Sequence, residues 1–124
     1  MNILVVDDDP VIVDVISELL SATNPSFKID STSHVGMAVS MVEKTKYDVV
    51  LTDFNMPGID GGTFTKLVKA KLPDCKVILV TGTDALEELH LKDIAYRIVY
   101  KPINWNLLEP LINEIEQGLN KTNQ

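Results

Sequence analysis

The chain has 124 residues and 45% of them are apolar, which is enough to build the hydrophobic core of one domain of ordinary size. Its formal net charge of −7 argues against direct binding of nucleic acid or of an anionic membrane surface, because both are bound by basic patches. Since the apolar runs are too short to span a bilayer and no signal peptide is visible, we expect a single cytoplasmic domain over residues 1–124.

The first predicted strand and helix lie at the amino terminus. Ile3–Val6 is a short, continuous apolar run, which is typical of a strand buried on both faces. Asp9 is expected to cap the helix that follows, with Pro10 at its first position, an arrangement that helices favour. Apolar residues at helical spacing predict the buried face of this helix: Val11, Val15, Leu19 and Leu20.

The middle of the chain repeats this alternation. Phe27–Ser31 alternates apolar and polar residues and is predicted to be an edge strand, whereas Asp48–Thr52 is again a continuous apolar run. The helix between these two strands is indicated by Val35, Ala38, Val39 and Val42. A weaker helical pattern follows the third strand and comprises Phe64, Leu67 and Val68.

The last part of the chain contains two more predicted strands, Lys76–Val80 and Tyr96–Tyr100, separated by a short helix around Ala85–Leu91. Cys75, the single cysteine, is expected to be a small buried side chain rather than a reactive thiol. The final helix has the clearest apolar stripe, and Pro110 within it is expected either to delay the start of the helix or to kink it. This stripe consists of Leu108, Leu111, Ile112, Ile115 and Leu119.

Strands and helices therefore alternate along the whole chain. Such alternation predicts an α/β fold: a doubly wound, five-stranded parallel sheet with helices on both faces, joined by right-handed crossovers. In open sheets of this kind, ligands bind at the edge where the carboxyl ends of the strands lie.

Polar side chains that could bind a ligand or take part in a reaction follow four of the predicted strands. The first strand ends at Asp7 and Asp8, the third at Asp53, the fourth at Thr81 and the fifth at Lys101. Because these ends lie on one edge of a parallel sheet, we expect the side chains to converge there. Each has a plainer explanation alone, as a helix cap, a turn residue, a strand exit or a surface lysine. Their joint occurrence at four strand ends favours a functional site.

The charges of this cluster favour a hard metal ion. Two carboxylates about 4 Å apart repel each other by roughly 4 kcal/mol at an effective dielectric constant near 20, and one lysine offsets only part of that repulsion. Mg²⁺ suits such a site, because it binds one or two carboxylates and keeps positions for water and phosphate oxygens. Zinc is not expected, because Cys75, His34 and His90 are expected to lie away from this edge.

Four segments closely resemble the motifs of the response regulator receiver family: Leu4–Asp9, Leu51–Gly61, Val80–Gly82 and Tyr100–Pro102. The resemblance covers essentially the whole chain. It implies a flavodoxin-like fold with five helices and strand order 2-1-3-4-5, and a cis peptide bond between Lys101 and Pro102.

By position, the resemblance also implies a role for each residue of the cluster. Asp53 would be the phosphoacceptor, Thr81 would hydrogen-bond the phosphoryl group, and Lys101 would pair with it. The resemblance implies Mg²⁺ as the cofactor, held by Asp53, by Asp8 directly, by Asp7 through water and by the backbone carbonyl of Asn55.

A protein of this family would act in two-component signalling and would not be an enzyme in the usual sense. Its chemistry would be limited to self-phosphorylation from phosphodonors and autodephosphorylation. The donor would be a histidine kinase or a histidine phosphotransfer protein. The surface made by the fourth helix, the fifth strand and the last helix would then act on an unidentified protein target, with the chain as a monomer or a phosphorylation-dependent dimer. Because Ile98 replaces the Phe or Tyr that the family often carries, we expect switching here not to depend on a ring at that position.

Two other functions compete with this interpretation. The first is a small aspartyl-phosphate phosphatase or phosphotransferase, but the segment Asp53–Asn55 resembles that nucleophile motif only faintly, and the chain has little room for a substrate-binding cap. The second is a flavin-binding electron carrier, in which the negative run Asp7–Asp9 would repel the flavin phosphate. Whether the domain acts alone or belongs to a longer regulator stays open.

Overall fold

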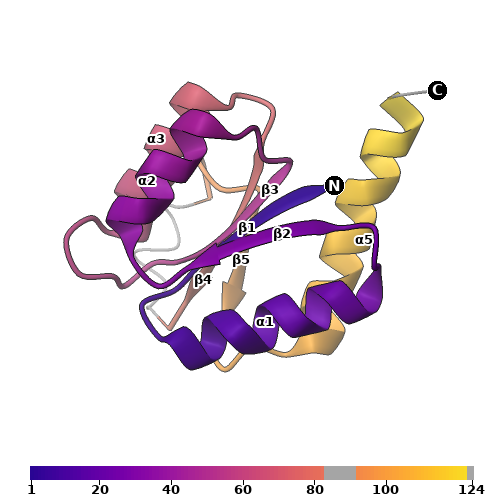
Figure 1. Cartoon of the computed structure of the whole chain (residues 1–124), viewed down its shortest axis with the longest axis horizontal. Helices are drawn as coiled ribbons and strands as arrows, with labels where there is room; N and C mark the ends of the chain where they lie inside the picture. The colour runs from indigo at the N-terminus through magenta and orange to yellow at the C-terminus, as the bar shows by residue number, and fades with distance from the viewer. Residues whose placement is uncertain (83–91, 123–124) are drawn as a thin grey trace.

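The computed structural model describes residues 1–82 and 92–122, and its centre is a five-stranded parallel sheet with the order β2-β1-β3-β4-β5 (Figure 1). Each predicted strand is present, with its ends displaced by at most one residue. The alternating second strand lies at an edge of the sheet, as predicted. The strands are β1 (Asn2–Val6), β2 (Lys28–Thr32), β3 (Val49–Asp53), β4 (Lys76–Thr81) and β5 (Arg97–Tyr100).

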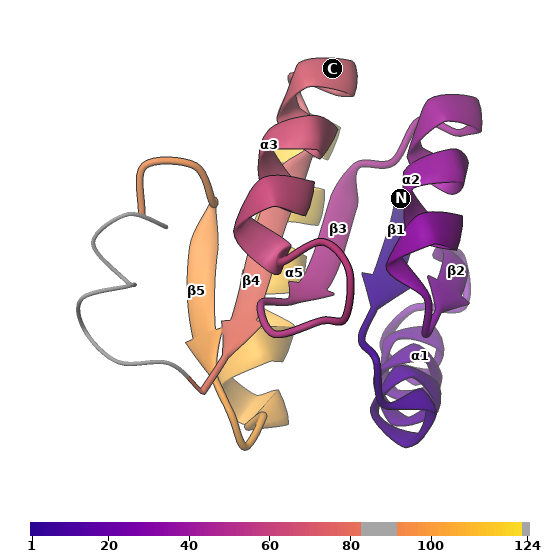
Figure 2. The same ribbon diagram turned by 90° about the vertical axis from the view of Figure 1, so that its left-hand side faces the viewer.

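Helices cover both faces of this sheet, which gives a doubly wound α/β fold (Figures 1 and 2). Because side chains alternate along a strand, Ile3 and Val5 belong to one hydrophobic cluster, and Leu4 and Val6 belong to the other. The first cluster packs under α1 (Pro10–Thr23) and α5 (Trp105–Thr122), and the second packs under α2 (Val35–Lys44) and α3 (Gly61–Lys71). The helix predicted around Ala85–Leu91 lies outside the described residues.

The start of α1 is as predicted, but its buried face is only partly so. The Asp9 side chain accepts a hydrogen bond from the Val11 backbone amide at 3.0 Å, and Pro10 is the first helical residue. The predicted face was wrong for Val11 and Val15, which are 67% and 49% exposed, whereas the predicted Leu20 is buried. The buried residues are Val13, Ile16 and Leu20. This helix carries apolar residues on more than one face, so spacing alone cannot decide which face meets the sheet.

The apolar stripe of α5 is confirmed, because Leu108, Ile112 and Ile115 are buried against the sheet. The expected late start at Pro110 is wrong, since the helix already begins at Trp105. Burial of Leu108 and the bond from its amide to the Asn104 carbonyl, at 3.1 Å, hold the turn that precedes the proline. Pro110 itself is exposed.

Three smaller expectations can be compared with the structure. Cys75 is buried, and burial raises the pKa of its thiol to about 12, which agrees with a structural rather than a reactive role. The peptide bond between Lys101 and Pro102 is cis, as the family resemblance implied. None of the helices in the described part of the chain combines the length and hydrophobicity needed to cross a membrane.

Gly61 allows α3 to begin directly against the end of β3. A Cβ atom at this position would collide with the Asp53 carbonyl oxygen and would lie 2.6 Å from the Phe54 Cα. The Gly61 amide also donates a hydrogen bond to the Phe54 carbonyl at 2.7 Å. The position of the Asp53 backbone therefore depends on a residue without a side chain at the start of the next helix.

We predict that Gly61→Ala lowers the free energy of unfolding by about 2 kcal/mol, because both colliding partners are backbone atoms that cannot rotate away. Gly118→Ala is the matched control: a Cβ there meets no atom within 4 Å, so the change should stabilise the helix by up to about 1 kcal/mol. Urea unfolding of both variants measures the difference. Equal stability of Gly61→Ala and the unsubstituted protein would contradict the close approach.

Candidate functional site

The carboxyl ends of the parallel strands lie at one edge of the sheet (Figure 2), and the polar residues predicted from the strand ends come together there. Asp7 and Lys101 directly follow β1 and β5, while Asp53 and Thr81 are the last residues of β3 and β4. The register places Val80 beside Asp53, so the ends of the two central strands are level. Asp7, Asp53 and Thr81 are buried, whereas the neighbouring Asp8 is exposed. The site therefore has a buried centre and one side that is open to solvent.

Three carboxylates and one ammonium group form the centre of this site. Asp7, Asp8 and Asp53 each contribute one carboxylate oxygen to a group whose atoms all lie within 4.8 Å of one another. The Lys101 Nζ lies 3.2 Å from Asp53 Oδ2 and 3.5 Å from Asp7 Oδ2. One lysine thus bridges the two buried carboxylates, and its single positive charge balances only one of the three.

Backbone hydrogen bonds fix these side chains in place. The Asp9 amide donates to Asp7 Oδ1 at 2.9 Å, and the Asn55 amide makes a longer contact of 3.4 Å with Asp53 Oδ1. Beyond the strand ends, the Lys101 amide donates to the Thr81 carbonyl at 2.9 Å. The sheet-like pairing therefore extends into the loops that carry the charged groups, so the charges have little freedom to move apart.

The pKa values of the charged groups reflect this crowding. Burial raises the pKa of Asp7, and the hydrogen bond from Asp9 and the charge of Lys101 offset only part of the rise. Burial also raises the pKa of Asp53, and the negative charge of Asp7 raises it further. Burial lowers the pKa of Lys101, but the hydrogen bonds and charges of Asp53 and Asp7 together outweigh burial, so this pKa is raised.

The donor set fits a hard divalent cation. All the side-chain donors are carboxylate oxygens, and the exposed Asp8 leaves an open side on which water or phosphate oxygens can complete the coordination of a metal. Asn55, whose backbone carbonyl the resemblance assigns to the metal, is exposed two residues after Asp53. Cys75 lies before β4, at the opposite edge, as expected.

The expectation that both histidines lie away from this edge was wrong for His34. It follows β2, and because β2 runs parallel to β1, its carboxyl end lies on the same edge as Asp7 and Asp8. His34 and Asp8 line the same pocket, although His34 is not part of the carboxylate cluster. His90 lies outside the described residues.

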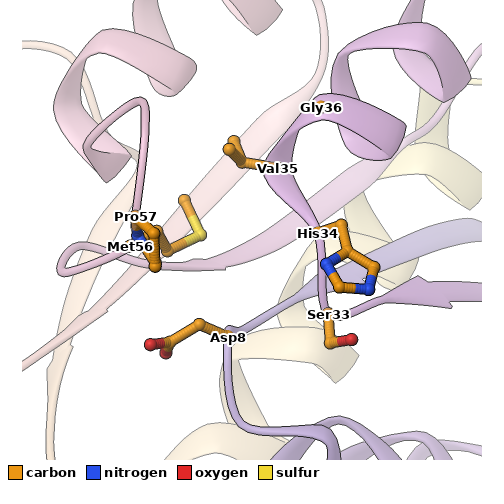
Figure 3. A pocket seen from close by; sticks show the side chains of 7 residues that line it. All are labelled: Asp8, Ser33, His34, Val35, Gly36, Met56 and Pro57. Atoms are coloured by element: carbon orange, nitrogen blue, oxygen red, sulfur yellow. The ribbon is translucent and has the colours of Figure 1, made fainter.

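That pocket is the part of the site that sequence reasoning missed. It has a volume of about 230 Å³ and lies beside Asp8, between the turns that follow β1, β2 and β3 (Figure 3). In the sequence, the pocket was indicated only by the position of residues 33–36 after the second strand. That position places these residues near Asp8 only when the order of the strands in the sheet is known. Its lining residues are Asp8, Ser33, His34, Val35, Gly36, Met56 and Pro57.

Comparison with known proteins gives a consistent result. A family model described as the response regulator receiver domain matches residues 3–113. The response regulator TrrA from Thermotoga maritima, solved in complex with Mg²⁺ and BeF, is 29% identical, with a TM-score of 0.81 over 92% of this chain and 97% of that chain. A CheY-like receiver domain protein from Methanospirillum hungatei is 25% identical, with a TM-score of 0.84 over 97% of both chains.

Curated relatives are longer proteins. The positive alginate biosynthesis regulatory protein of Pseudomonas aeruginosa is 31% identical over 83% of this chain and 42% of its own length. The sensory transduction protein LytR of Staphylococcus saprophyticus is 25% identical over all of this chain and 49% of its own length. Among such relatives the chain spans from 14% to 49% of the relative's length, so the similarity concerns one domain of each.

The raised carboxylate pKa values predict how stability depends on pH without a divalent cation. A carboxyl group with a raised pKa in the folded state favours folding at low pH, and this contribution is lost as the pH rises through the folded-state pKa. Asp7→Asn removes one of the buried charges and should therefore raise the free energy of unfolding at pH 7 by on the order of 1 kcal/mol. The gain should shrink as the pH falls to about 4, where carboxyl groups become protonated.

Urea unfolding in the presence of a chelator at both pH values measures this effect. Asp14→Asn, on the exposed side of α1, is the matched control and should change little. If Asp7→Asn is destabilising at pH 7, the bond to Lys101 outweighs burial and repulsion, and the direction of the pKa shift given above is incorrect.

Proposed function

The chain belongs to the response regulator receiver family, and we propose that Asp53 accepts a phosphoryl group from a phosphohistidine on a partner protein, in a reaction that needs Mg²⁺. The observation that carries this proposal is the buried Asp53 carboxylate at the end of β3, held 3.2 Å from Lys101 Nζ beside two further carboxylates. Residues 1–124 would form one receiver domain, and a cytoplasmic location belongs to the same proposal.

Asp53 is the best placed of the three carboxylates to act as the nucleophile. Asp7 is oriented by the Asp9 amide and shares Lys101, whereas Asp8 is exposed and free to act as a ligand from the open side. Asp53 ends the central strand β3, and its carboxylate receives a long backbone contact of 3.4 Å from the Asn55 amide in addition to Lys101 Nζ at 3.2 Å. Lys101 would stabilise the charge on the transferred group.

The other residues have supporting roles in this proposal. Bound Mg²⁺ would supply positive charge to the equatorial phosphoryl oxygens and relieve the carboxylate repulsion. Asp8 would bind the metal directly, Asp7 through water, and Asn55 through its backbone carbonyl. Thr81, the buried last residue of β4, would hydrogen-bond the phosphoryl group once it is on Asp53.

The family consists mostly of signalling phosphoacceptors, and some relatives join the receiver to an enzymatic domain, such as a protein-glutamate methylesterase from Methanospirillum hungatei. For this chain we propose no catalytic turnover beyond self-phosphorylation and autodephosphorylation. A histidine kinase or a histidine phosphotransfer protein would be the donor. The exposed Val11 and Val15, one helical turn apart on α1 and near the same edge as Asp53, offer an apolar contact to such a protein.

The output would pass through β5 and α5. Ile98 is half-buried on β5, while Tyr100 is 43% exposed at the end of that strand and Leu107 is 65% exposed in the first turn of α5. These residues would form part of the surface that a downstream protein or a second copy recognises after phosphorylation. The family position usually taken by an aromatic ring is aliphatic here, so the response would come from movement of β5 and of Thr81.

Acetyl phosphate with Mg²⁺ should add a single phosphoryl group to the protein, because it supplies the same transferable group as a phosphohistidine. Intact-mass measurement should show the added mass on the unsubstituted protein and on the control Asp14→Asn, and none on Asp53→Asn. If Asp53→Asn gains as much mass as the unsubstituted protein, Asp53 is not the phosphoacceptor.

Mg²⁺ alone should stabilise the fold, because it binds the assembled carboxylates and not the unfolded chain. At a concentration about ten times the dissociation constant, the expected gain is roughly 1.4 kcal/mol. Thermal unfolding with and without millimolar Mg²⁺ measures the effect, and Asp8→Ala should lose most of it, whereas Asp14→Ala should keep it. A full Mg²⁺ effect in Asp8→Ala would mean that Asp8 is not a principal ligand.

A further inference from the structure

The outer edge of β2 is open to solvent in the described part of the chain. β2 is the last strand on its side of the sheet. Figure 1 shows it in front of the other strands, with α2 above it, α1 below it and no described segment crossing in front of it. Its side chains agree with this view, since Lys28, Asp30 and Ser31 are exposed. A further strand could therefore pair with this edge.

The hydrogen bonds to β1 determine which backbone groups of β2 face outward. The Lys28 amide donates to the Met1 carbonyl at 2.9 Å, and the Thr32 carbonyl accepts at 3.4 Å from the residue that follows β1. Backbone groups point to alternate sides along a strand, so every second residue faces β1 as Lys28 does. The amides and carbonyls of Ile29 and Ser31 therefore point away from the sheet, and no described group outside the sheet bonds to them.

The charged side chains of this edge complement each other across a pair of antiparallel strands. Lys28 and Asp30 are two residues apart and lie on the same face of β2. Asp30 accepts a hydrogen bond from the Tyr47 hydroxyl at 2.7 Å, and neither Lys28 nor Asp30 forms an ion pair with a described residue. A single charge protects an edge strand from pairing, because it meets its own kind in a second copy. Two opposite charges instead favour the register in which they face each other.

We propose that two copies of this chain pair through the outer edges of β2, antiparallel, about a two-fold axis at Ile29. The Ile29 amide of each copy donates to the Ile29 carbonyl of the other, which makes the contact isologous. Lys28 then lies opposite Asp30 of the second copy, at the position where side chains of an antiparallel pair approach most closely. Symmetry repeats this ion pair, so the segment Lys28–Asp30 specifies both the orientation and the register of the pairing.

This association is separate from the phosphoryl transfer proposed above. The acidic edge lies at the carboxyl ends of the strands, whereas the pairing uses the outer side of β2. Because the paired strands run in opposite directions, the acidic edges of the two copies lie at opposite ends of the joined sheet. The pairing therefore leaves both Asp53 side chains as accessible as they are in one copy, and it needs neither Mg²⁺ nor a phosphodonor.

Sedimentation velocity from micromolar to millimolar protein, without Mg²⁺ or a phosphodonor, measures the association, and charge reversal tests the register. Lys28→Glu and Asp30→Lys each place like charges opposite one another. Each variant alone should have a dissociation constant raised by at least about tenfold, or about 1.4 kcal/mol. An equimolar mixture of the two restores opposite charges at both positions and should associate within about threefold of the unsubstituted protein.

Tyr47→Phe is the matched control for these variants, because it removes the hydrogen bond that Asp30→Lys also loses and leaves the charge unchanged. It should associate as the unsubstituted protein does, and thermal unfolding should show that each variant is folded. A protein that stays monomeric at millimolar concentration overturns the inference. So does a dimer that neither charge reversal weakens, or a mixture of folded variants that fails to associate.

Amide hydrogen exchange tests the backbone contact without any substitution. Exchange at Ile29 should slow by about threefold or more as the protein concentration rises and dimers form, whereas the Lys28 amide, which is bonded to Met1 in each copy, should change little. Ser31→Pro removes an outward-facing donor and keeps the bonds to β1, so it should weaken the dimer with little effect on thermal unfolding. If Ile29 exchanges equally fast in monomer and dimer, the copies do not pair through β2 and the inference is overturned.

Discussion

Repulsion among carboxylates that cannot move apart is the constraint on which the rest of this structure depends. Asp7 and Asp53 are almost completely buried at the ends of β1 and β3, and the two strands are paired along their length. Two like charges about 4 Å apart repel each other by roughly 4 kcal/mol at an effective dielectric constant near 20, and burial, the largest cause of the raised pKa values of Asp7 and Asp53, adds to the cost of keeping both groups ionised. Lys101 relieves part of this by bridging the two buried groups. The repulsion that Lys101 does not relieve favours the binding of a cation, or of a positively charged group, that completes the site.

The rigidity that maintains this repulsion comes from the two hydrophobic clusters. Each inner strand contributes side chains to both, as Ile3 and Leu4 do on β1, so a strand end cannot shift without disturbing the packing on two faces. Gly61 adds a second restraint by bringing the start of α3 against the Asp53 carbonyl. The site is therefore prepared before any ligand arrives, which is the condition under which fixed charges stabilise a transferring group most effectively.

The sequence was sufficient to predict what depends on local pattern and on strand ends. Continuous runs of Val, Ile and Leu marked the inner strands, and the polar residues at the ends of four of the five strands identified the acidic edge. Features set by tertiary contacts were missed. The buried face of α1 was wrong, since Val11 and Val13 are equally apolar and only the sheet distinguishes them. His34 was misplaced, because its position becomes visible only when β2 is known to run parallel beside β1.

The same restraints determine where a signal from Asp53 can travel. Phosphorylation would replace one negative charge by a group carrying about two, next to a lysine already shared with Asp7. The inner strands are fixed by packing on both faces, but β5 is a four-residue edge strand with Ile98 only half-buried and Tyr100 exposed. It is joined to the site through the hydrogen bond from the Lys101 amide to the Thr81 carbonyl. A change in the position of Lys101 would therefore act first on β5 and on the start of α5, because among the described elements next to Lys101 these can move without opening the core.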